Sequence, residues 1–448
     1  MHKFRKDDEM KTLLVGGGAR EHAIAKALKK GDVTLFACMH NKNPGIAKLC
    51  EDFRMVKETD VEKVVDYARR KNIELCVVGP EAPLEKGVGD ELEKNGIKTV
   101  GPTKNAAEIE TSKSFMRNLM KKHNIPGDVE CKVFDNADDA KDFVEKMGDV
   151  VVKPVGLTGG KGVKIVGEQL KDSDDALNYA KEIIKNKIGG IPKVVVEEKI
   201  VGEEFTLQGF CDGKKIVPMP AVQDNKRAFE NDEGPNTGGM GSYSQEDGLL
   251  PFLKKNEYDV AVDIMQKIIW AMKKEGREYK GILYGQFMLS KAGPRVIECN
   301  ARFGDPEAMN VLPLLESDFV EVCNRIVDGG LKNASFMKKA TVCKYVVPKG
   351  YGIKPMADRE LTVDEKNVEK EGAELFYASV NERDGKIYTT TSRALGVLGV
   401  ADSIEKAEVI AENGLKHISG EIYVRHDIGK KDYIEKKVKR MEGIRNAV

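Results

Sequence analysis

The sequence predicts a multidomain protein of mixed α/β and α+β class, with an N-terminal doubly wound parallel sheet, central antiparallel sheets and a mixed C-terminal domain. Three observations predict it. Apolar strands and amphipathic helices alternate over about the first hundred residues, which is typical of a parallel sheet with crossover helices. Short strands separated by glycine turns follow, which favours antiparallel pairing. The 448 residues also exceed one ordinary core, so several domains are expected.

The first region, residues 10–105, opens with the apolar strand KTLLV, a glycine turn and the helix AREHAIAKAL. VTLFAC, IELCVVG and IKTVG predict further strands, and DVEKVVDYARRK has the spacing of an amphipathic helix. The turn does not complete the dinucleotide fingerprint G-x-G-x-x-G, because the third position counted from Gly16 is Glu21. A tight strand-to-helix turn explains the glycines equally well, so a dinucleotide-dependent oxidoreductase is disfavoured.

The second region, residues 106–330, begins with a helix over SKSFMRNLMKKHNI that is expected to end before Pro126. Short strands around glycine turns follow, and EYDVAVDIMQKIIWAMKKEG predicts a long amphipathic helix. The third region, residues 331–448, contains strands such as ATVCKYVVP and a helix over SIEKAEVIAENGLKHI.

Composition excludes several classes of function. Lys plus Arg and Asp plus Glu number 73 each, and this balance argues against a nucleic-acid-binding role. No apolar run is long enough to span a bilayer, and MHKFRKDDEM is not a signal peptide. The eight cysteines never form C-x-x-C and the six histidines lack metal-ligand spacing. We therefore expect reduced thiols, a cytoplasmic location and no structural zinc.

A glycine-rich loop, KPVGLTGGKGV, lies between two predicted strands with Lys153 at one end and Lys161 near the other. It is not a P-loop, which requires G-x-x-x-x-G-K-[ST] opening a helix, because Gly162 follows Lys161. A mobile glycine loop can close over a triphosphate, and lysine offsets phosphate charge. An ordinary flexible hairpin would explain the glycines but not the flanking lysines.

The predicted hairpin LYGQFMLSKAGPRVIECN brings oxygen ligands together. Glu298 and Asn300 are two residues apart and share one face of a strand. If the turn centres on Ala292, Gln286 lies opposite Glu298. Carboxylate and amide oxygens are ligands that Mg²⁺ accepts beside substrate phosphates. The opposite face is expected to be the core face, formed by Phe287, Ile297 and Cys299.

Three polar stretches complete the candidate site. Acidic residues follow the apolar run in VVVEEKIVGEEF, where they can accept hydrogen bonds from an adenine amino group or ribose hydroxyls, although such acids are usually solvated. Arg302 offers a planar fork to a carboxylate or phosphate, and Asp305 can hold an ammonium group. The long polar segment DNKRAFENDEGPNTGGMGSYS is more typical of a functional loop than of an idle one.

Seven segments together resemble the ATP-grasp superfamily and, within it, the phosphoribosylamine–glycine ligase family. They run in family order over about residues 11 to 310 and are GGGAREHA, VGPEAPLEKGV, GPTKNAAEIETSKSF, GLTGGKGV, VVVEEKIVGEE, DNKRAFENDEGPNTGGMGSYS and IECNARFGDPE. The resemblance implies an N-terminal substrate domain at 10–105, an ATP-grasp domain at 106–330 with a lid at about 135–205, and a C-terminal domain at 331–448. In this superfamily a glycine hairpin closes over ATP between two antiparallel sheets.

The resemblance also implies roles for individual residues. Lys113 and Lys153 should contact the ATP phosphates. Glu197 and the Ile200 backbone should contact the adenine, and Glu203 should contact the ribose. The full ATP-binding set is Lys113, Lys153, Gly159, Gly160, Lys161, Glu197, Ile200 and Glu203. Mg²⁺ or Mn²⁺ should bind Gln286, Glu298 and Asn300. Glycine and phosphoribosylamine should face Gly17, Gly18, Glu81, Arg302 and Asp305, with Arg302 and Asp305 as the catalytic pair.

The implied reaction is ATP-dependent ligation of glycine to 5-phosphoribosylamine through glycyl phosphate, in de novo purine biosynthesis. The implied partners are these small molecules alone, with neither nucleic acid nor membrane, and the implied state is a monomer. The chain departs from the family at Pro154–Val155 and Thr158–Gly159, where the family often has Ala-Asp and two alanines. It also has Met309 where the family usually has Gln or Glu. The first nine residues have no family counterpart, so Met10 is an alternative start.

Two further hypotheses stay open. A related ATP-grasp ligase could join another carboxylate to another amine, and a substrate panel would separate the two. The second hypothesis is a regulator that binds a nucleotide without catalysis. The presence of Lys153, Glu298 and Asn300 argues against it.

Overall fold

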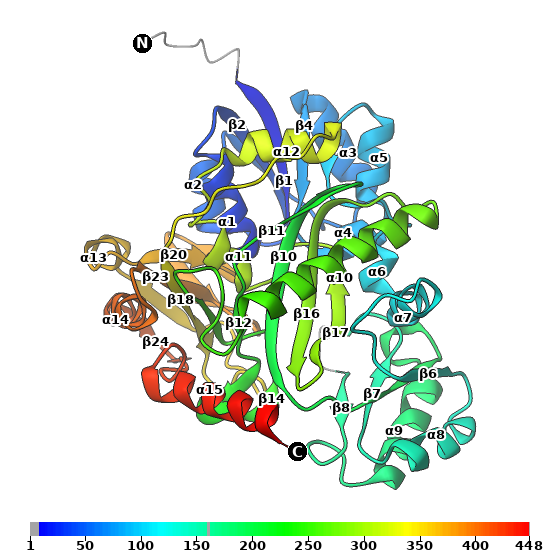
Figure 1. The fold of residues 1–448 in the computed structure, drawn as a ribbon. Helices are drawn as coiled ribbons and strands as arrows, with labels where there is room; N and C mark the ends of the chain where they lie inside the picture. Colours follow the sequence, from blue (N-terminus) through cyan, green and yellow to red (C-terminus); the bar gives the residue numbers. More distant parts are fainter. Residues whose placement is uncertain (1–8, 159–161, 448) are drawn as a thin grey trace.

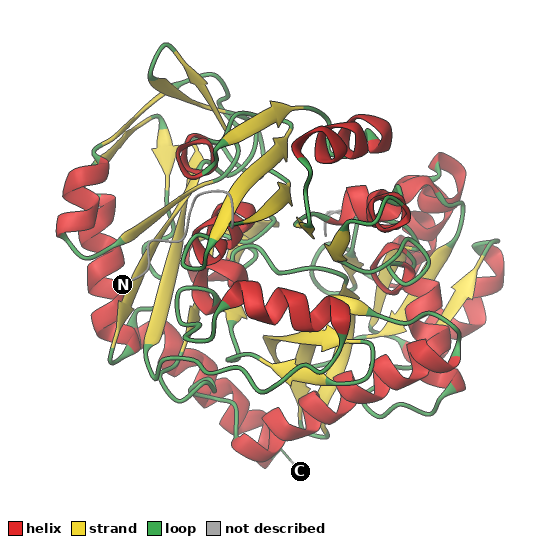
Figure 2. Cartoon of the chain, turned by 90° about the horizontal axis from the view of Figure 1, so that it is seen from above, coloured by secondary structure: helices red, strands yellow, loops and turns green. Residues whose placement is uncertain are grey.

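The computed structural model describes residues 9–158 and 162–447, in which strands form six sheets. Figure 1 shows the N-terminal sheet at the top, the central sheet below it, the lid at the lower right and the C-terminal sheets at the left. Viewed from above, helices surround much of the sheet framework (Figure 2). Among the described residues, no helix combines the length and the apolar character that crossing a membrane requires.

The N-terminal sheet has five parallel strands in the order β3-β2-β1-β4-β5, which confirms the predicted doubly wound topology. The strands are β1 (Met10–Val15), β2 (Val33–Met39), β3 (Asp52–Met55), β4 (Leu75–Val78) and β5 (Lys98–Val100). The helices of this region are α1 (Ala19–Leu28), α2 (Pro44–Leu49), α3 (Val61–Lys71), α4 (Glu81–Glu85) and α5 (Val88–Lys94). Strand β1 is buried at its centre because the helices cover both faces of the sheet.

The central sheet is antiparallel, in the order β11-β10-β16-β17. Its strands are β10 (Glu203–Asp212), β11 (Ile216–Pro218), β16 (Lys280–Ser290) and β17 (Gly293–Asn300). Helix α10 (Lys255–Lys274) buries Ile264, Ile268 and Met272 against this sheet at helical spacing. Two shorter helices, α6 (Glu108–Thr111) and α7 (Lys113–Lys122), pack on β17. Helix α12 (Phe319–Asp328) contacts both β5 and β10, and so links the N-terminal and central sheets.

The lid is a second antiparallel sheet with its own apolar core, in the order β6-β9-β7-β8. Its strands are β6 (Cys131–Phe134), β7 (Val150–Pro154), β8 (Lys164–Ile165) and β9 (Val194–Glu198), backed by α8 (Lys141–Met147) and α9 (Ser173–Asn186). The glycine-rich segment connects β7 to β8. Gly159, Gly160 and Lys161, three of the predicted ATP-binding residues, lie outside the described residues.

The C-terminal region contributes two sheets, ordered β12-β15-β18-β23-β20 and β21-β22-β19-β24, with β25 beside β18. Two strands from before residue 245 join the first of these sheets, so that sheet combines residues of the central and C-terminal regions. The strands are β12 (Gln223–Asp224), β15 (Gly241–Ser244), β18 (Ala340–Pro348), β19 (Glu360–Val363), β20 (Glu374–Tyr377), β21 (Val380–Arg383), β22 (Lys386–Thr389), β23 (Leu395–Ala401), β24 (Ile418–Gly420) and β25 (Ile422–Tyr423). The remaining elements are the ribbon β13 (Arg227–Phe229) and β14 (Glu233–Asn236), and helices α11 (Glu307–Val311), α13 (Glu365–Lys370), α14 (Ile404–Leu415) and α15 (Lys431–Asn446).

Met309 in α11 is fully buried, and its Sδ lies 4.0 Å from the Cys343 Sγ. A Cβ added to Gly396 of β23 would lie 2.7 Å from the same Sδ, so the two elements are in close contact there. The methionine therefore fills the core between α11 and the C-terminal sheet, and its thioether accepts a weak hydrogen bond from the Cys343 thiol.

Candidate active site

A cavity of about 670 Å³ lies where the lid, the central sheet, the N-terminal region and the C-terminal region meet. Its lining includes most of the predicted site residues. They are Glu81, Lys113, Lys153, Glu197, Ile200, Glu203, Gln286, Glu298, Asn300, Arg302 and Asp305. Residues more than two hundred positions apart in the sequence thus share one cavity, which is large enough for a substrate of nucleotide size.

Gln286 pairs with Glu298 across the β16–β17 hairpin, as the sequence predicted. The expected turn centre at Ala292 is wrong, because the turn pairs Ser290 with Gly293 and centres between Lys291 and Ala292. That register alone would place Ile297 opposite Gln286. A β-bulge between Gln286 and Phe287 shifts the register by one residue. The bulge therefore directs Glu298 and Asn300 toward the cavity.

The predicted core face of this hairpin is partly wrong. Phe287 and Cys299 are buried as expected. Ile297 is only half-buried and lines the cavity, because it is the extra residue at the bulge. Val296, which is fully buried opposite Phe287, takes the core position instead.

The oxygen atoms of this hairpin fit a divalent cation. Gln286 Oε1 is buried without a hydrogen-bond partner among the described residues, while its Nε2 donates to Glu204 Oε2 at 2.6 Å. Glu298 Oε1 accepts a hydrogen bond from Asn300 Nδ2 at 3.2 Å. Within the described ranges, no group of three or more His, Cys, Asp or Glu side chains is arranged to hold a metal. A site here would therefore use two amides and one carboxylate, which suits Mg²⁺ with substrate phosphates.

The charge of Glu298 is maintained by neighbouring cations. Burial raises its pKa, but Lys226, Lys113 and Lys153 outweigh that effect together with the hydrogen bond from Asn300, and the pKa is lowered overall. Glu298 is therefore ionised at neutral pH, as a metal ligand must be.

Two lysines that were predicted to bind phosphate, Lys113 and Lys153, also line the cavity. Lys153 on β7 is 4% exposed, and its Nζ lies 2.5 Å from Glu197 Oε2. Lys113 begins α7 and donates through Nζ to the Gly156 carbonyl at 3.1 Å. Burial lowers the pKa of Lys113, although the nearby Glu298 carboxylate opposes this effect. Both lysines line the cavity, Lys153 from the lid and Lys113 from α7.

Sequence reasoning missed the partner that fixes Glu197. Arg117 on α7 is 1% exposed and donates to both carboxylate oxygens of Glu197, at 2.8 and 3.0 Å. Burial raises the pKa of Glu197, but Arg117 and Lys153 more than offset it and lower the pKa to about 2. The available signal was an arginine on the apolar face of an amphipathic helix, beside Met116 and Met120.

The far end of the cavity holds Arg302. Its guanidinium bridges Glu81, at 3.3 Å, and Glu110, at 2.8 Å. Burial raises the pKa of Glu110 to about 7, although Arg302 opposes the rise. Asp305 accepts from the Tyr345 hydroxyl and lies 3.1 Å from Arg393 Nη2.

Several lining residues at this end were not predicted, and they include Arg20, Asp224 and Arg393. Arg20 of α1 lies 3.9 Å from Glu81, and Arg393 comes from the C-terminal region. Asp224 Oδ1 is buried without a hydrogen-bond partner in the described parts of the chain. Burial, increased by the nearby charge of Glu307, raises the pKa of Asp224 well above its ordinary value.

Gly17 and Gly18 do not appear among the described residues that line the cavity. The Gly18 N–H at the start of α1 donates to Glu21 Oε2 at 2.7 Å. A Cβ at Gly16 or Gly79 would lie within 3 Å of the Glu21 side chain, so the carboxylate is packed into this turn. The helix N-terminus therefore binds the chain's own anion, which disfavours a dinucleotide pyrophosphate at that position.

Two antiparallel sheets with a cavity between them that is lined by buried lysines, carboxylates and amides define an ATP-grasp enzyme. The family models agree in chain order. Residues 10–110 match the phosphoribosylglycinamide synthetase N domain, residues 111–308 the ATP-grasp (A) domain and residues 341–431 the C domain. The chain belongs to the phosphoribosylglycinamide synthetase family.

Named relatives and solved structures are consistent with this assignment. The phosphoribosylamine–glycine ligases of Methanothermobacter thermautotrophicus and Methanocaldococcus jannaschii are 54% and 55% identical, over 98% and 97% of this chain and 100% of theirs. The crystal structure of phosphoribosylamine–glycine ligase from Thermotoga maritima has a TM-score of 0.80 at 26% identity, covering 93% of this chain and 100% of that one. A biotin carboxylase domain from Hydrogenobacter thermophilus has a TM-score of 0.75 at 16% identity, covering 98% of this chain and 99% of that one, and shows the shared fold alone.

Proposed function

We propose that this chain joins glycine to 5-phosphoribosylamine at the expense of ATP, giving glycinamide ribonucleotide, ADP and phosphate in de novo purine biosynthesis. The observation that carries the proposal is the full-length identity of 54% to a phosphoribosylamine–glycine ligase, in a chain whose cavity contains both the lysines and the oxygen ligands. A glycine carboxylate is a poor electrophile, so it is first converted to glycyl phosphate.

The first step forms a bond between a glycine carboxylate oxygen and the γ-phosphorus and breaks the bond to the β-phosphate oxygen, releasing ADP. Phosphoryl transfer requires positioning and charge stabilisation from the protein. Lys113 and Lys153 serve this purpose because their ammonium groups reach the cavity. Binding of phosphate by Lys153 competes with its ion pair to Glu197, which Arg117 continues to hold.

Glu197 and the Ile200 backbone then contact adenine, and Glu203 contacts the ribose. We propose that Gly159, Gly160 and Lys161 complete the phosphate contacts from the lid.

Mg²⁺ or Mn²⁺ is the proposed cation, held by Gln286, Glu298 and Asn300. A bound cation of this kind neutralises phosphate charge and orients the triphosphate. The unpaired Oε1 of Gln286 and the ionised carboxylate of Glu298 support the assignment.

In the second step the amine of phosphoribosylamine attacks the acyl carbon, the carbon–oxygen bond to phosphate breaks, and the nitrogen loses a proton. Arg302 and Asp305 are the proposed catalytic pair, and their position with Glu81 in the cavity lining supports contact with these substrates. Arg302 can neutralise the carboxylate or phosphate oxygens as charge develops. We still propose that Gly17 and Gly18 contact substrate, although they are not among the described residues that line the cavity. Closure of the lid would keep water from the acyl phosphate.

We also propose the domain limits 10–105, 106–330 with a lid at 135–205, and 331–448. We propose a monomer located in the cytoplasm, with neither nucleic acid nor membrane as a partner. Gel filtration with light scattering tests the oligomeric state.

The function is tested by coupled ADP release with freshly made phosphoribosylamine. ADP should form only when glycine and the amine are both present, and mass spectrometry should detect their amide. Faster turnover with bicarbonate, formate or an aminoimidazole would favour a related ATP-grasp ligase instead.

A further inference from the structure

Helix α15 begins at Lys431, the residue at which the match to the C-domain family model over residues 341–431 ends. It packs on β10 and β16 of the central sheet through buried side chains that include Ile434 and Met441. Figure 1 shows this helix below the C-terminal sheets, near the ribbon strand β14. Two of its cations, Lys437 and Arg440, line the nucleotide cavity.

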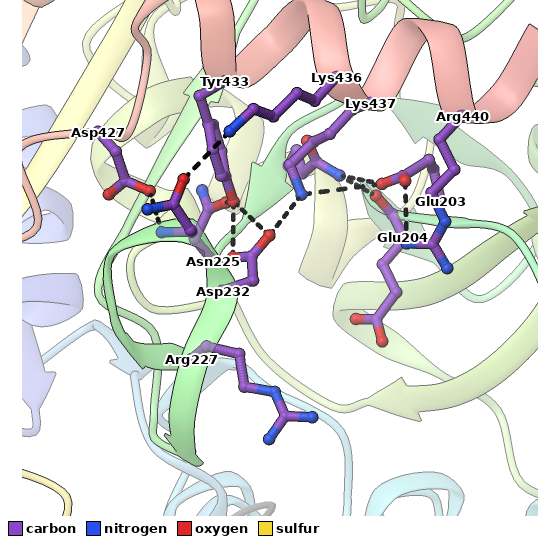
Figure 3. Close-up of polar contacts among 12 residues, drawn as sticks. Glu203, Glu204, Asn225, Arg227, Asp232, Asp427, Tyr433, Lys436, Lys437 and Arg440 are labelled. Carbon is purple, nitrogen blue, oxygen red and sulfur yellow. Dashed lines mark hydrogen bonds and ion pairs between the residues drawn. The ribbon is translucent and has the colours of Figure 1, made fainter. Parts of the chain in front are cut away.

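Both cations are directed at Glu203 (Figure 3). Glu203 is 3% exposed at the start of β10. Arg440 Nη1 donates to Glu203 Oε1 at 3.2 Å, and Lys437 Nζ lies 3.8 Å from Oε2. Gln223 Nε2 approaches the same Oε2 at 3.4 Å. The carboxylate is therefore surrounded by donors, and two of these come from α15.

Lys437 is itself held in place. Its side chain is 13% exposed, and its Nζ lies 3.0 Å from Asp232 Oδ2 in the turn between β13 and β14. The Tyr433 hydroxyl donates to Asp232 at 2.7 Å, and the Lys437 ammonium lies 4.6 Å from the Tyr433 ring centroid. Arg425 also contacts Asp232 at 3.0 Å. Lys437 thus bridges the β13–β14 ribbon and Glu203 with little freedom to move.

We propose that α15 forms a wall of the nucleotide site, in which Lys437 and Arg440 are positioning residues that hold Glu203 as an ionised carboxylate toward the ribose hydroxyls. The inference rests on the proposed function, which assigns Glu203 to the ribose. An ionised carboxylate only accepts hydrogen bonds, so it can receive both hydroxyls of a ribose at once. Burial raises the pKa of Glu203 overall, and Lys437 and Arg440 limit that rise.

The consequence is selectivity for ribonucleotides. A 2′-deoxynucleotide leaves one acceptor position of Glu203 without a donor, and a hydrogen bond to a charged group is worth about a tenfold change in affinity. Loss of Lys437 frees the carboxylate to turn or to take up a proton, and the gain from the second hydroxyl should then fall.

Calorimetric titration tests the inference without turnover. The imido analogue of ATP and its 2′-deoxy counterpart are titrated into the full chain with Mg²⁺. We expect wild type to prefer the ribonucleotide about tenfold, Lys437→Met to reduce this preference to about twofold, and Lys437→Arg to restore most of it. Lys436→Met is the matched control, because the Lys436 ammonium contacts Asn231 at 3.2 Å and not Glu203. It should keep the wild-type preference.

Arg440→Met provides a second variant that removes a mostly exposed side chain, because the Arg440 side chain is 60% exposed. The preference of Arg440→Met for the ribonucleotide should be about threefold lower than that of wild type, and its melting temperature should be unchanged. Equal weakening of both nucleotides in the two variants, or the absence of a preference in wild type, would overturn the inference and leave the ligase reaction standing. A wild type that shows the preference yet releases no ADP with glycine and phosphoribosylamine would overturn the proposed function instead.

Discussion

Gln286 and Glu298 lie directly opposite each other on neighbouring strands because a single bulged residue shifts the β17 register. Without that shift the carboxylate would point to the other face of the sheet, since side chains alternate along a strand. The proposed cation site therefore depends on a local irregularity of the hairpin. Several consequences can be measured.

Glu298→Ala should reduce the ligase rate by roughly 100- to 1000-fold, because the single carboxylate of the proposed cation site is removed. Circular dichroism and the melting temperature should change little, since the site is a cavity wall. Glu278→Ala, an exposed glutamate just before β16, is the matched control and should keep the wild-type rate. A Glu298→Ala variant near the wild-type rate would remove the cation assignment.

Gln286→Leu should raise the Mg²⁺ concentration needed for half-maximal activity by about tenfold, because one neutral oxygen ligand is lost. The KM for glycine should stay unchanged, since Gln286 is on the triphosphate side of the proposed site. Chelation with EDTA should abolish activity in both proteins, and Mg²⁺ or Mn²⁺ should restore it. An unchanged Mg²⁺ requirement in the variant would argue against Gln286 as a ligand.

Glu197→Gln should flatten the acid side of the stability profile. The pKa of Glu197 in the folded chain is about 2, below its ordinary value of 4.5. A lowered pKa in the folded state stabilises the protein above pH 4.5, and this contribution is lost as the pH falls toward 2. Urea unfolding between these two pH values should show a shallower loss of stability in the variant than in wild type. Parallel pH profiles for the two proteins would contradict the assignment.

Arg117→Met should lower the free energy of unfolding by about 3–5 kcal/mol, because it leaves the buried Glu197 with Lys153 as its remaining close cation. The double variant with Glu197→Gln should recover part of this loss, since the buried carboxylate that lost its bidentate partner is then neutral. Urea denaturation of both variants measures the coupling. A double variant that loses the sum of both single effects would show that the pair is not coupled.

Arg302→Lys should raise the KM values for glycine or phosphoribosylamine with a smaller effect on ATP. A lysine cannot reproduce the planar fork that contacts Glu81 and Glu110 together. We expect a loss of about 100-fold in kcat/KM for the affected substrate, measured at saturating ATP. An effect confined to the KM for ATP would move Arg302 to the nucleotide end of the site.

The sequence predicted the fold because its local signals were regular. Strand–helix alternation indicated the parallel N-terminal sheet, and hairpin spacing indicated that Gln286 and Glu298 would meet. Residue spacing could not predict the bulge at Ile297, because the bulge depends on how β16 and β17 pair. Residues from distant elements were also missed. Arg117 on α7 reaches Glu197, and Arg393 in the C-terminal region reaches the cavity, only through tertiary packing. Neither lies in a stretch whose local spacing points to a ligand.

A crystal structure with the imido analogue of ATP and Mn²⁺ tests the central claim most directly. Anomalous scattering should place Mn²⁺ between the triphosphate and the oxygens of Gln286, Glu298 and Asn300, with the phosphates beside Lys113 and Lys153. A triphosphate or an anomalous peak outside the cavity between the lid and the central sheet would contradict it.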